Sequence, residues 1–325
     1  MKIFRYQKRN TPPYLLEFSP SFDDFSKSGC VLALGFFDGV HLGHRALINR
    51  AKSEARELGI PFGIFTFPSE NKLKSAAPRL TTTDEKCEIF ESLGADFTIL
   101  ADFDSMVDLS AEDFVSNVLI KDVGAKSAVA GYNFRFGKGA LGNVALLLSE
   151  MEKHGARGIA IDEFSLASGS VSASAVRALL QEGKPREAAA LLGQPYFLSG
   201  VVEHGNGVGR GLGYPTVNTP IPGGKALPRP GVYRSAIRMG DQLLTALTNV
   251  GVCPTLGERS IHAETFILNF KGDIYGKAVT VFLLDYLREE MRFSDVSNLI
   301  TQIDRDVENI TKNFGDVTWQ EIGLS

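Results

Sequence analysis

The sequence has few cysteines and no run of 18 or more apolar residues, and each shortage removes a class of protein. Without such a run, the sequence offers no membrane-spanning helix. The basic stretch 1–9 is followed by no apolar segment, so we expect no secretory signal. The three cysteines, Cys30, Cys87 and Cys253, are widely spaced and form no C-x-x-C pair, which argues against a disulfide framework or a cysteine metal cage. These features favour a cytoplasmic location.

An excess of positive charge is also lacking. The net charge is −4; residues 1–185 carry 21 basic and 23 acidic side chains, and residues 186–325 carry 13 and 15. Neither part has the basic excess that is typical of nucleic-acid-binding proteins. We therefore expect small-molecule partners, with any phosphate chemistry performed by a few placed groups. The composition leaves the oligomeric state open.

The first half of the chain alternates between short apolar runs and segments with helical periodicity. Strands are predicted at 30–35, 62–67, 97–100 and 127–130, and helices at 42–58, 83–93 and 111–119. Gly59 is expected to end the first of these helices, and Thr83 to cap the second. Strands separated by helices predict an α/β fold with a parallel, doubly wound, Rossmann-like sheet.

The pattern changes after about residue 170. Two short helices are predicted at 174–182 and 185–192, with Gly183 and Gly193 as their stops. Five strand-like segments without intervening helices follow, and then an amphipathic helix; the strands are 196–203, 232–239, 243–250, 263–270 and 279–287, and the helix is 294–313. This order predicts an antiparallel barrel or sandwich. We place the domain boundary between residues 185 and 186, which gives domains 1–185 and 186–325.

The decapeptide 35–44 leaves an apolar strand and enters a helix, and it contains His41 and His44. In parallel sheets, ligands collect at such strand-to-helix turns, where free N–H groups and the helix dipole suit phosphate. Histidines three residues apart project from one side of the first helical turn. The alternative is a purely structural role, in which both histidines only cap the helix and pack against it. A zinc site is a weaker alternative, since no third ligand is evident.

The decapeptide closely resembles the first signature of the bacterial bifunctional riboflavin kinase/FMN adenylyltransferases, also called FAD synthetases. The resemblance implies that His41 and His44 are catalytic and that Gly35, Phe37, Asp38 and Gly39 bind nucleotide phosphates. The segment 131–137 resembles the flavin side of that family and points to Asn133, Arg135 and Phe136. The segment 171–177 resembles the late serine–arginine segment of nucleotidyltransferases, in which Ser174 and Arg177 would hold ATP phosphates. An ordinary helix cap is the alternative for Ser174.

Two positions depart from the family pattern. The late segment has Ala173 and Ala175 where consecutive hydroxyl residues are common. Ser69 and Glu70 follow Pro68 where the family usually has a proline–histidine pair. Both departures fall in the transferase half.

The segment 204–218 is rich in glycine and ends in Thr216 and Asn218. Such a backbone can fold its N–H groups around an anion, although a mobile hairpin has a similar composition. Thr216 and Asn218 lie two residues apart, so in an extended strand they share a face, and their oxygens suit Mg²⁺ that also touches ATP phosphates. Farther along, Glu264 shares a predicted strand face with Phe266 and Leu268. A solvent-facing edge charge is the alternative reading of Glu264.

The second half also resembles the same family, through its riboflavin kinase signature at 204–218 and through later segments at 231–233, 249–255, 264–270, 273–276 and 287–293. The resemblance implies a six-stranded antiparallel barrel with a C-terminal helix. It further implies that Glu264 is the general base and that Mg²⁺ is held by Thr216 and Asn218. Nucleotide-binding residues would be Gly205, Gly207, Arg210, Gly213 and Thr216, with Arg288 on the flavin side.

The sequence therefore predicts a two-step enzyme that uses ATP and Mg²⁺. Riboflavin would be phosphorylated to FMN, and FMN would then be adenylylated to FAD with release of pyrophosphate. Two alternatives stay open: a riboflavin kinase with a weak or lost adenylyltransferase, and a flavin- or nucleotide-binding regulator without either activity.

Overall fold

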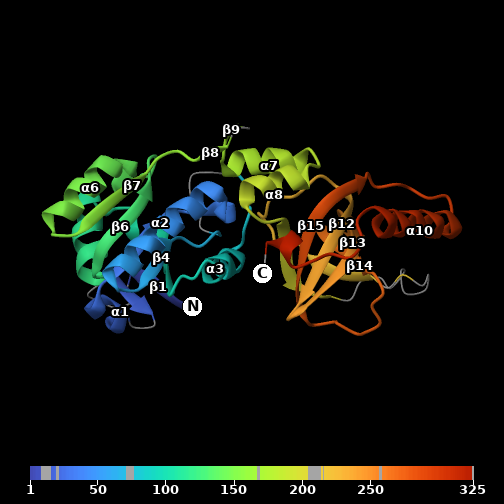
Figure 1. Cartoon of the computed structure of the whole chain (residues 1–325), viewed down its shortest axis with the longest axis horizontal. Coiled ribbons are helices and arrows are strands. Elements are labelled where there is room, and N and C mark those ends of the chain that lie inside the picture. The colour runs from blue at the N-terminus through green and yellow to red at the C-terminus, as the bar shows by residue number, and fades with distance from the viewer. Residues whose placement is uncertain are drawn as a thin grey trace. The chain divides into compact units, whose positions relative to one another are not determined.

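A computed structural model describes residues 1–8, 16–19, 22–70, 77–166, 169–203, 214, 216–255 and 258–323 (Figure 1). The chain divides into two compact units, Met1–Ser172 and Ala173–Ser325. The predicted functional boundary at 185/186 stays a prediction. Among the described residues, no helix is both long and apolar enough to cross a membrane.

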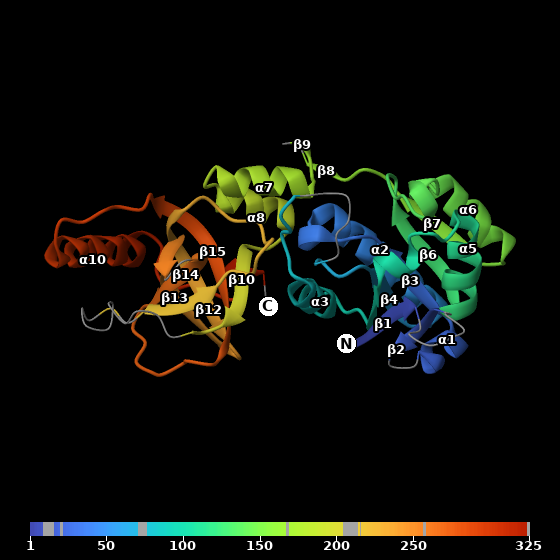
Figure 2. The same ribbon diagram turned by 180° about the vertical axis from the view of Figure 1, so that it is seen from behind.

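The first unit is built on a seven-stranded sheet with the order β2-β1-β5-β4-β3-β6-β7. Neighbouring strands are parallel except β1 and β2, which pair antiparallel at one edge (Figure 2). The strands are β1 (Lys2–Lys8), β2 (Leu16–Ser19), β3 (Cys30–Leu34), β4 (Phe62–Thr66), β5 (Phe97–Ala101), β6 (Ala125–Gly131) and β7 (Arg157–Ile161). The predicted α/β fold is confirmed, whereas β1, β2 and β7 were not expected.

Helices connect these strands. They are α1 (Asp23–Ser28), α2 (Leu42–Leu58), α3 (Thr83–Ser92), α4 (Phe103–Met106), α5 (Ala111–Asp113) with the π-helix η2 (Phe114–Asp122), and α6 (Val144–Lys153); short 3₁₀ turns η1 (Asp38–Val40) and η3 (Lys138–Ala140) and a hairpin of β8 (Ser165–Leu166) and β9 (Gly169–Ser170) complete the unit. Gly59 ends α2 with φ 67°, as expected. The expected cap of α3 was wrong by one residue. Thr82 is the N-cap, because it forms a capping box with Glu85.

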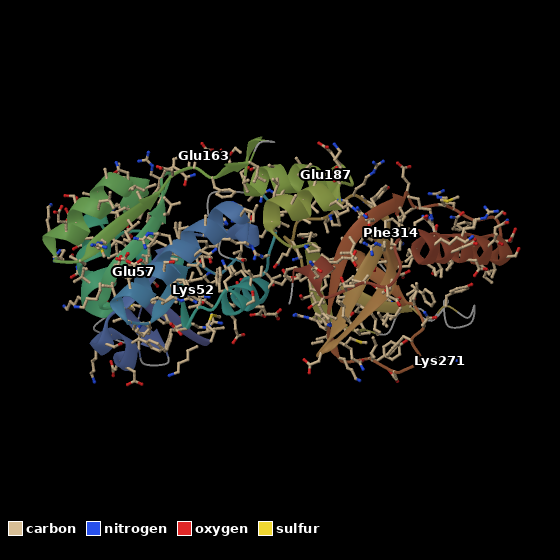
Figure 3. All side chains as sticks on the ribbon, in the orientation of Figure 1. Lys52, Glu57, Glu163, Glu187, Lys271 and Phe314 are labelled. Atoms are coloured by element: carbon tan, nitrogen blue, oxygen red, sulfur yellow. The ribbon has the colours of Figure 1, made fainter. Side chains whose placement is uncertain are left out.

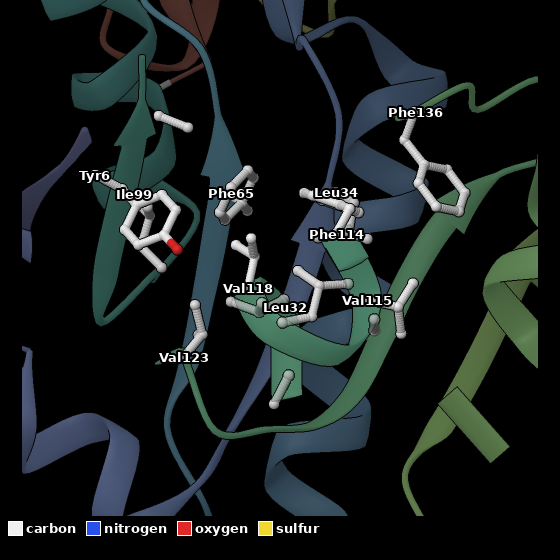
Figure 4. Close-up of a cluster of buried hydrophobic side chains, with 14 of the residues drawn as sticks. Tyr6, Leu32, Leu34, Phe65, Ile99, Phe114, Val115, Val118, Val123 and Phe136 are labelled. Carbon is white, nitrogen blue, oxygen red and sulfur yellow. The ribbon is translucent and has the colours of Figure 1, made fainter. Parts of the chain in front are cut away.

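The core of the first unit lies between the sheet and the segment 111–123 (Figure 4). Leu32 and Leu34 of β3 are buried there, together with Phe114 of η2. Burying a side chain of this size contributes about 1.5–3 kcal/mol each. This packing fixes β3 and β6 next to each other and so fixes where their carboxyl ends lie.

The second unit begins with α7 (Ala173–Gln181) and α8 (Pro185–Leu192) and continues as an antiparallel six-stranded sheet with the order β10-β15-β12-β13-β14-β11. Its strands are β10 (Tyr196–Val201), β11 (Thr216–Pro220), β12 (Gly231–Met239), β13 (Gln242–Thr255), β14 (Glu258–Ile267) and β15 (Ala278–Arg288). The Glu203 N–H donates to the Asn218 carbonyl at 2.9 Å, which joins the two ends of this order into a barrel. The barrel implied by the resemblance is confirmed, and β11 is the strand beyond the five that periodicity predicts.

The C-terminal segment packs on the barrel through α10 (Val296–Asn313) and the short turn η4 (Gln320–Ile322). Ile310 of α10 is buried against Val232 and Leu247 of the barrel wall. Beyond the helix lies Phe314, labelled in Figure 3, whose ring lies 4.6 Å from the guanidinium of the buried Arg234. α10 therefore covers the barrel face that carries Glu264.

Candidate active sites

The first candidate site lies where β3 turns into α2. β3 is hydrogen-bonded to β4 on one side and to β6 on the other, and the chain reaches β6 only after forming β4 and β5. The carboxyl ends of β3 and β6 therefore form the topological switch point, where ligands bind in open parallel sheets. Phe37 and Val40 adopt positive φ angles of 57° and 44° in this turn. Such backbone strain at non-glycine residues clusters at functional sites.

His41 and His44 lie at the start of α2. His41 is the N-cap residue, and its Nδ1 accepts the His44 backbone N–H at 3.4 Å. The two rings stack with centroids 3.7 Å apart and planes 18° apart. The expectation that both imidazoles share one side of the first turn is confirmed.

Burial controls the charge of these imidazoles. It lowers the pKa of His41 to about 4. Burial also holds the pKa of His44 well below its ordinary value, and the neighbouring His41 and Lys86 add to this effect. The buried Nδ1 of His44 has no hydrogen-bond partner within the described ranges. The pair therefore presents neutral imidazoles, whose N–H groups can donate hydrogen bonds.

This burial predicts a pH dependence. The unfolded chain protonates His41 near pH 6.5, whereas the folded chain does so only near pH 4. The unfolded state therefore binds more protons between these values, and the fold loses up to about 3 kcal/mol as the pH falls through this window. An NMR titration should place the His41 ring midpoint near pH 4, with the resonance assigned through its loss in His41→Asn. A midpoint near pH 6.5 would contradict the burial of this ring.

Two further side chains hold the turn in place. The Asp38 carboxylate accepts the Leu80 N–H at 2.7 Å, so this residue anchors the turn to the segment before α3. Lys86 of α3 is buried, and its Nζ donates to the carbonyls of Phe36, at 3.2 Å, and of Phe67. Burial lowers the pKa of Lys86 to about 8. Sequence reasoning missed Lys86, because a lysine on an amphipathic helix is usually exposed to solvent.

The predicted flavin-side segment follows β6 and so lies at the same switch point. Asn133 and Arg135 are exposed. Phe136 is buried, with its ring centroid 5.3 Å from that of Phe114 and 5.5 Å from that of Phe134. Phe136 therefore belongs to the core beneath the segment, and the exposed polar side chains are the ones free to meet a ligand.

The departure at Ser69 and Glu70 has a local structural role. The Ser69 N–H donates to Thr83 Oγ1 at 2.8 Å, and the Glu70 carboxylate accepts the Thr83 N–H at 3.3 Å and its hydroxyl. Burial by itself raises the pKa of Glu70, but the hydrogen bonds from Thr83 and from its own backbone, together with the charge of Lys86, lower the pKa overall. Glu70 is therefore an ionised cap for the first turn of α3, where negative charge is favoured.

Ser174 and Arg177 lie on α7 in the second unit. The guanidinium Nη2 of Arg177 donates to Ser174 Oγ at 3.3 Å, and the Ser174 side chain is exposed. One hydroxyl and one guanidinium on adjacent turns form a pair that suits phosphate oxygens.

The second candidate site is a pocket of about 290 Å³ on the barrel beneath α10. Its polar lining includes Thr216, Glu264 and Asn249, and the other residues that line it are Tyr214, Val232, Leu247, Phe266, Arg288, Glu290, Met291, Phe293, Leu299 and Ile303. The expectation that Glu264 and Phe266 share a face is confirmed, and Leu268 packs on the cluster under α10. A pocket with apolar walls and a few converging polar groups is typical of a small-molecule site.

Strand register aligns Asn218, Glu264 and Asn249 in a row, and of these Glu264 and Asn249 line the pocket. Glu264 of β14 is the direct partner of Asn218 on β11 and of Asn249 on β13. Directly opposite residues in antiparallel strands point to the same face. Thr216 is paired with Phe266 in the next row on that face, so Thr216 and Asn218 share a side as expected.

Arg288 lies at the end of β15 and lines the pocket, and its guanidinium forms hydrogen bonds within the protein. Its Nη2 and Nε donate to Asp306 Oδ2 at 2.7 and 2.9 Å, which ties β15 to α10. The predicted nucleotide-binding residues Gly205, Gly207, Arg210 and Gly213 lie outside the described residues. Within the described part of the chain, no three His, Cys, Asp or Glu side chains are grouped to hold a metal.

The two units thus define a class of protein, an enzyme with a nucleotidyltransferase-like sheet and a separate small-molecule pocket on a β-barrel. The FAD synthetase family model matches residues 23–175, and the riboflavin kinase family model matches residues 192–314. The bifunctional riboflavin kinase/FMN adenylyltransferase of Escherichia coli K12 is 34% identical over 295 residues, covering 89% of this chain and 94% of that protein. Its counterpart in Bacillus subtilis is 30% identical over 88% of this chain and 93% of that protein.

The chain belongs to the family of bifunctional riboflavin kinase/FMN adenylyltransferases. It phosphorylates riboflavin to FMN with ATP and then adenylylates FMN to FAD. A crystal structure named for a macrolide-efflux protein from Streptococcus pneumoniae is also similar. It is 27% identical, has a TM-score of 0.80, and covers 97% of this chain and 100% of that one.

Proposed function

We propose that the two reactions use two different sets of the residues described above. In the adenylylation, His41 and His44 and the turn residues Gly35, Phe37, Asp38 and Gly39 hold ATP, and the resemblance assigns the α7 pair Ser174 and Arg177 to ATP phosphates in the same reaction. Asn133 and Arg135 meet FMN, and Phe136 supports them from the core. The support is the meeting of β3 and β6 at the switch point and the neutral, stacked imidazoles at the start of α2.

In this reaction a phosphate oxygen of FMN attacks the α-phosphorus of ATP, the new P–O bond forms, and the bond to pyrophosphate breaks. The transferred group gains charge as the bonds change. The imidazole N–H groups and the Arg177 guanidinium stabilise that charge, because preorganised donors lower the transition-state energy. No nucleophilic side chain is needed, since the attacking oxygen belongs to the substrate.

In the second reaction, Glu264 accepts the proton of the terminal ribityl hydroxyl while its oxygen attacks the γ-phosphorus of ATP, and ADP leaves. Gly205, Gly207, Arg210, Gly213 and Thr216 hold the nucleotide, and Arg288 lies on the flavin side. The observation that carries this assignment is the row of Asn218, Glu264 and Asn249 across three strands, in which Glu264 and Asn249 line a pocket with mostly apolar walls. Phosphoryl transfer requires this kind of positioning and a modest base near the hydroxyl.

Mg²⁺ suits Thr216 and Asn218, which lie in neighbouring rows on one face of the barrel. Thr216 contributes a hydroxyl and Asn218 an amide oxygen, and oxygen donors of this kind are what Mg²⁺ prefers. When bound, Mg²⁺ neutralises phosphate charge during transfer. Since these two side chains supply only part of a coordination shell, nucleotide oxygens and water would supply the rest. The buried free thiols of Cys30 and Cys87 support the proposed cytoplasmic location.

Incubation of the protein with riboflavin, ATP and Mg²⁺ should accumulate FAD, with FMN as the intermediate. Excess chelator should stop both steps, because it removes the Mg²⁺ that is proposed to bind together with the nucleotide phosphates. Chromatography of the flavins separates the outcomes. FMN without FAD would remove the transferase assignment, and undiminished turnover in chelator would remove the Mg²⁺ assignment.

A further inference from the structure

Asn249 lines the kinase pocket but has no role in the chemistry above. It lies on β13 as the direct partner of Glu264, on the side away from Asn218. Its buried Oδ1 has no hydrogen-bond partner among the described residues. An unpaired buried acceptor costs about 1–3 kcal/mol, so its presence at a pocket wall points to a donor that arrives with the ligand.

Glu290 fixes the direction in which the Asn249 amide faces. The Nδ2 of Asn249 donates to Glu290 Oε1 at 3.1 Å, which leaves Oδ1 as the free end of the amide. Glu290 lies against Gly251, and a Cβ on that residue would overlap the carboxylate. The glycine therefore leaves the room that Glu290 needs to hold the amide.

The spacing of the row matches an extended polyol. Neighbouring strands lie about 4.7–4.9 Å apart, so Asn249 and Glu264 are separated by about that distance along the row. The five-carbon ribityl chain of riboflavin is long enough to reach from one strand to the next. With its terminal hydroxyl at Glu264, a hydroxyl in the middle of the chain lies beside Asn249. The ring system then falls toward the apolar residues Leu247, Leu299 and Ile303.

We propose that Asn249 is a specificity-determining residue for the kinase, which accepts a hydrogen bond from the 3′-hydroxyl of the ribityl chain through Oδ1. Glu290 is its positioning residue. The inference rests on the proposed role of the pocket as the riboflavin site. It assigns the polyol, rather than the ring, as the part of the substrate that β13 recognises.

The test pairs Asn249→Ala with riboflavin and its 2′-, 3′- and 4′-deoxy analogues. For riboflavin, the substitution should lower kcat/KM by roughly tenfold or more, as expected for the loss of one buried hydrogen bond. For 3′-deoxyriboflavin, the kcat/KM values of variant and wild type should agree within about twofold, because the analogue lacks the hydroxyl that donates to Asn249. A penalty that persists undiminished with all three analogues would overturn the proposal, and cancellation with a different analogue would overturn the 3′ assignment.

Controls separate this outcome from general damage. Asn313→Ala, at an exposed position of α10, should leave kcat/KM unchanged for riboflavin and for all three analogues. Glu290→Ala should reproduce part of the Asn249→Ala pattern, and Glu290→Gln, which keeps an acceptor, should restore much of the loss. Failure of the wild-type protein to phosphorylate riboflavin would instead reject the riboflavin pocket itself, before Asn249 is tested.

Discussion

Replacing Glu264 by Gln is expected to lower FMN formation from riboflavin by about 10²–10⁴ in rate, since this is what a general base typically contributes. Gln keeps the size of the side chain and can still accept a hydrogen bond, but it cannot take the proton from the ribityl hydroxyl. The register pairs with Asn218 and Asn249 are backbone features of the sheet, so the barrel should be retained. Steady-state phosphorylation of riboflavin, followed by flavin chromatography, measures the effect.

A matched control is Glu308→Gln on an exposed turn of α10, which should leave the rate unchanged. If Glu264→Gln phosphorylates riboflavin within a few-fold of wild type, Glu264 is a structural charge and the kinase has another base. A loss of rate accompanied by a lower melting temperature would point to damage of the barrel instead.

Replacing His44 by Ala should lower adenylylation of supplied FMN by about 10²–10³, the usual cost of one preorganised donor at a developing charge. His41→Ala should have a similar effect and should also loosen the start of α2, because His41 is its N-cap. Both variants should phosphorylate riboflavin at nearly the wild-type rate. The measurement is FAD formation from FMN and ATP with Mg²⁺ present.

His154→Ala is the matched control, because His154 is an exposed residue after α6 in the same unit. It should leave adenylylation unchanged. Equal loss of both activities in His41→Ala and His44→Ala, together with an unfolded circular-dichroism spectrum, would favour a purely structural role for the pair.

The sequence predicts the central strands well, because every residue of β3, β4 and β5 is buried and β6 is buried over 127–130. Edge strands are harder to predict from periodicity. β7 is only partly buried, and the isolated run Arg157–Ile161 is short, so periodicity alone did not identify it. β11 was likewise absent from the strands predicted by periodicity, since it follows a glycine-rich segment and contains Pro220. The cap of α3 was misplaced because three consecutive threonines, 81–83, offer the same signal.

The motifs predict which residues belong to the sites. They predict neither the charge of these side chains nor the residues that hold them in place. Spacing predicted that His41 and His44 share a side, whereas their low pKa values depend on how deeply the fold buries the two rings. Lys86 and Leu80 are remote from the turn in sequence but form hydrogen bonds to it. Asn249 and Glu264 come together only through the register of β13 and β14, which a single strand does not encode.

The most direct test of two separate active sites is a set of four rates, with Glu264→Gln and His44→Ala each assayed with riboflavin and with FMN. We expect Glu264→Gln to lose FMN formation and to keep adenylylation of supplied FMN, and we expect His44→Ala to show the reverse. Loss of both rates in both folded variants would contradict two separate active sites.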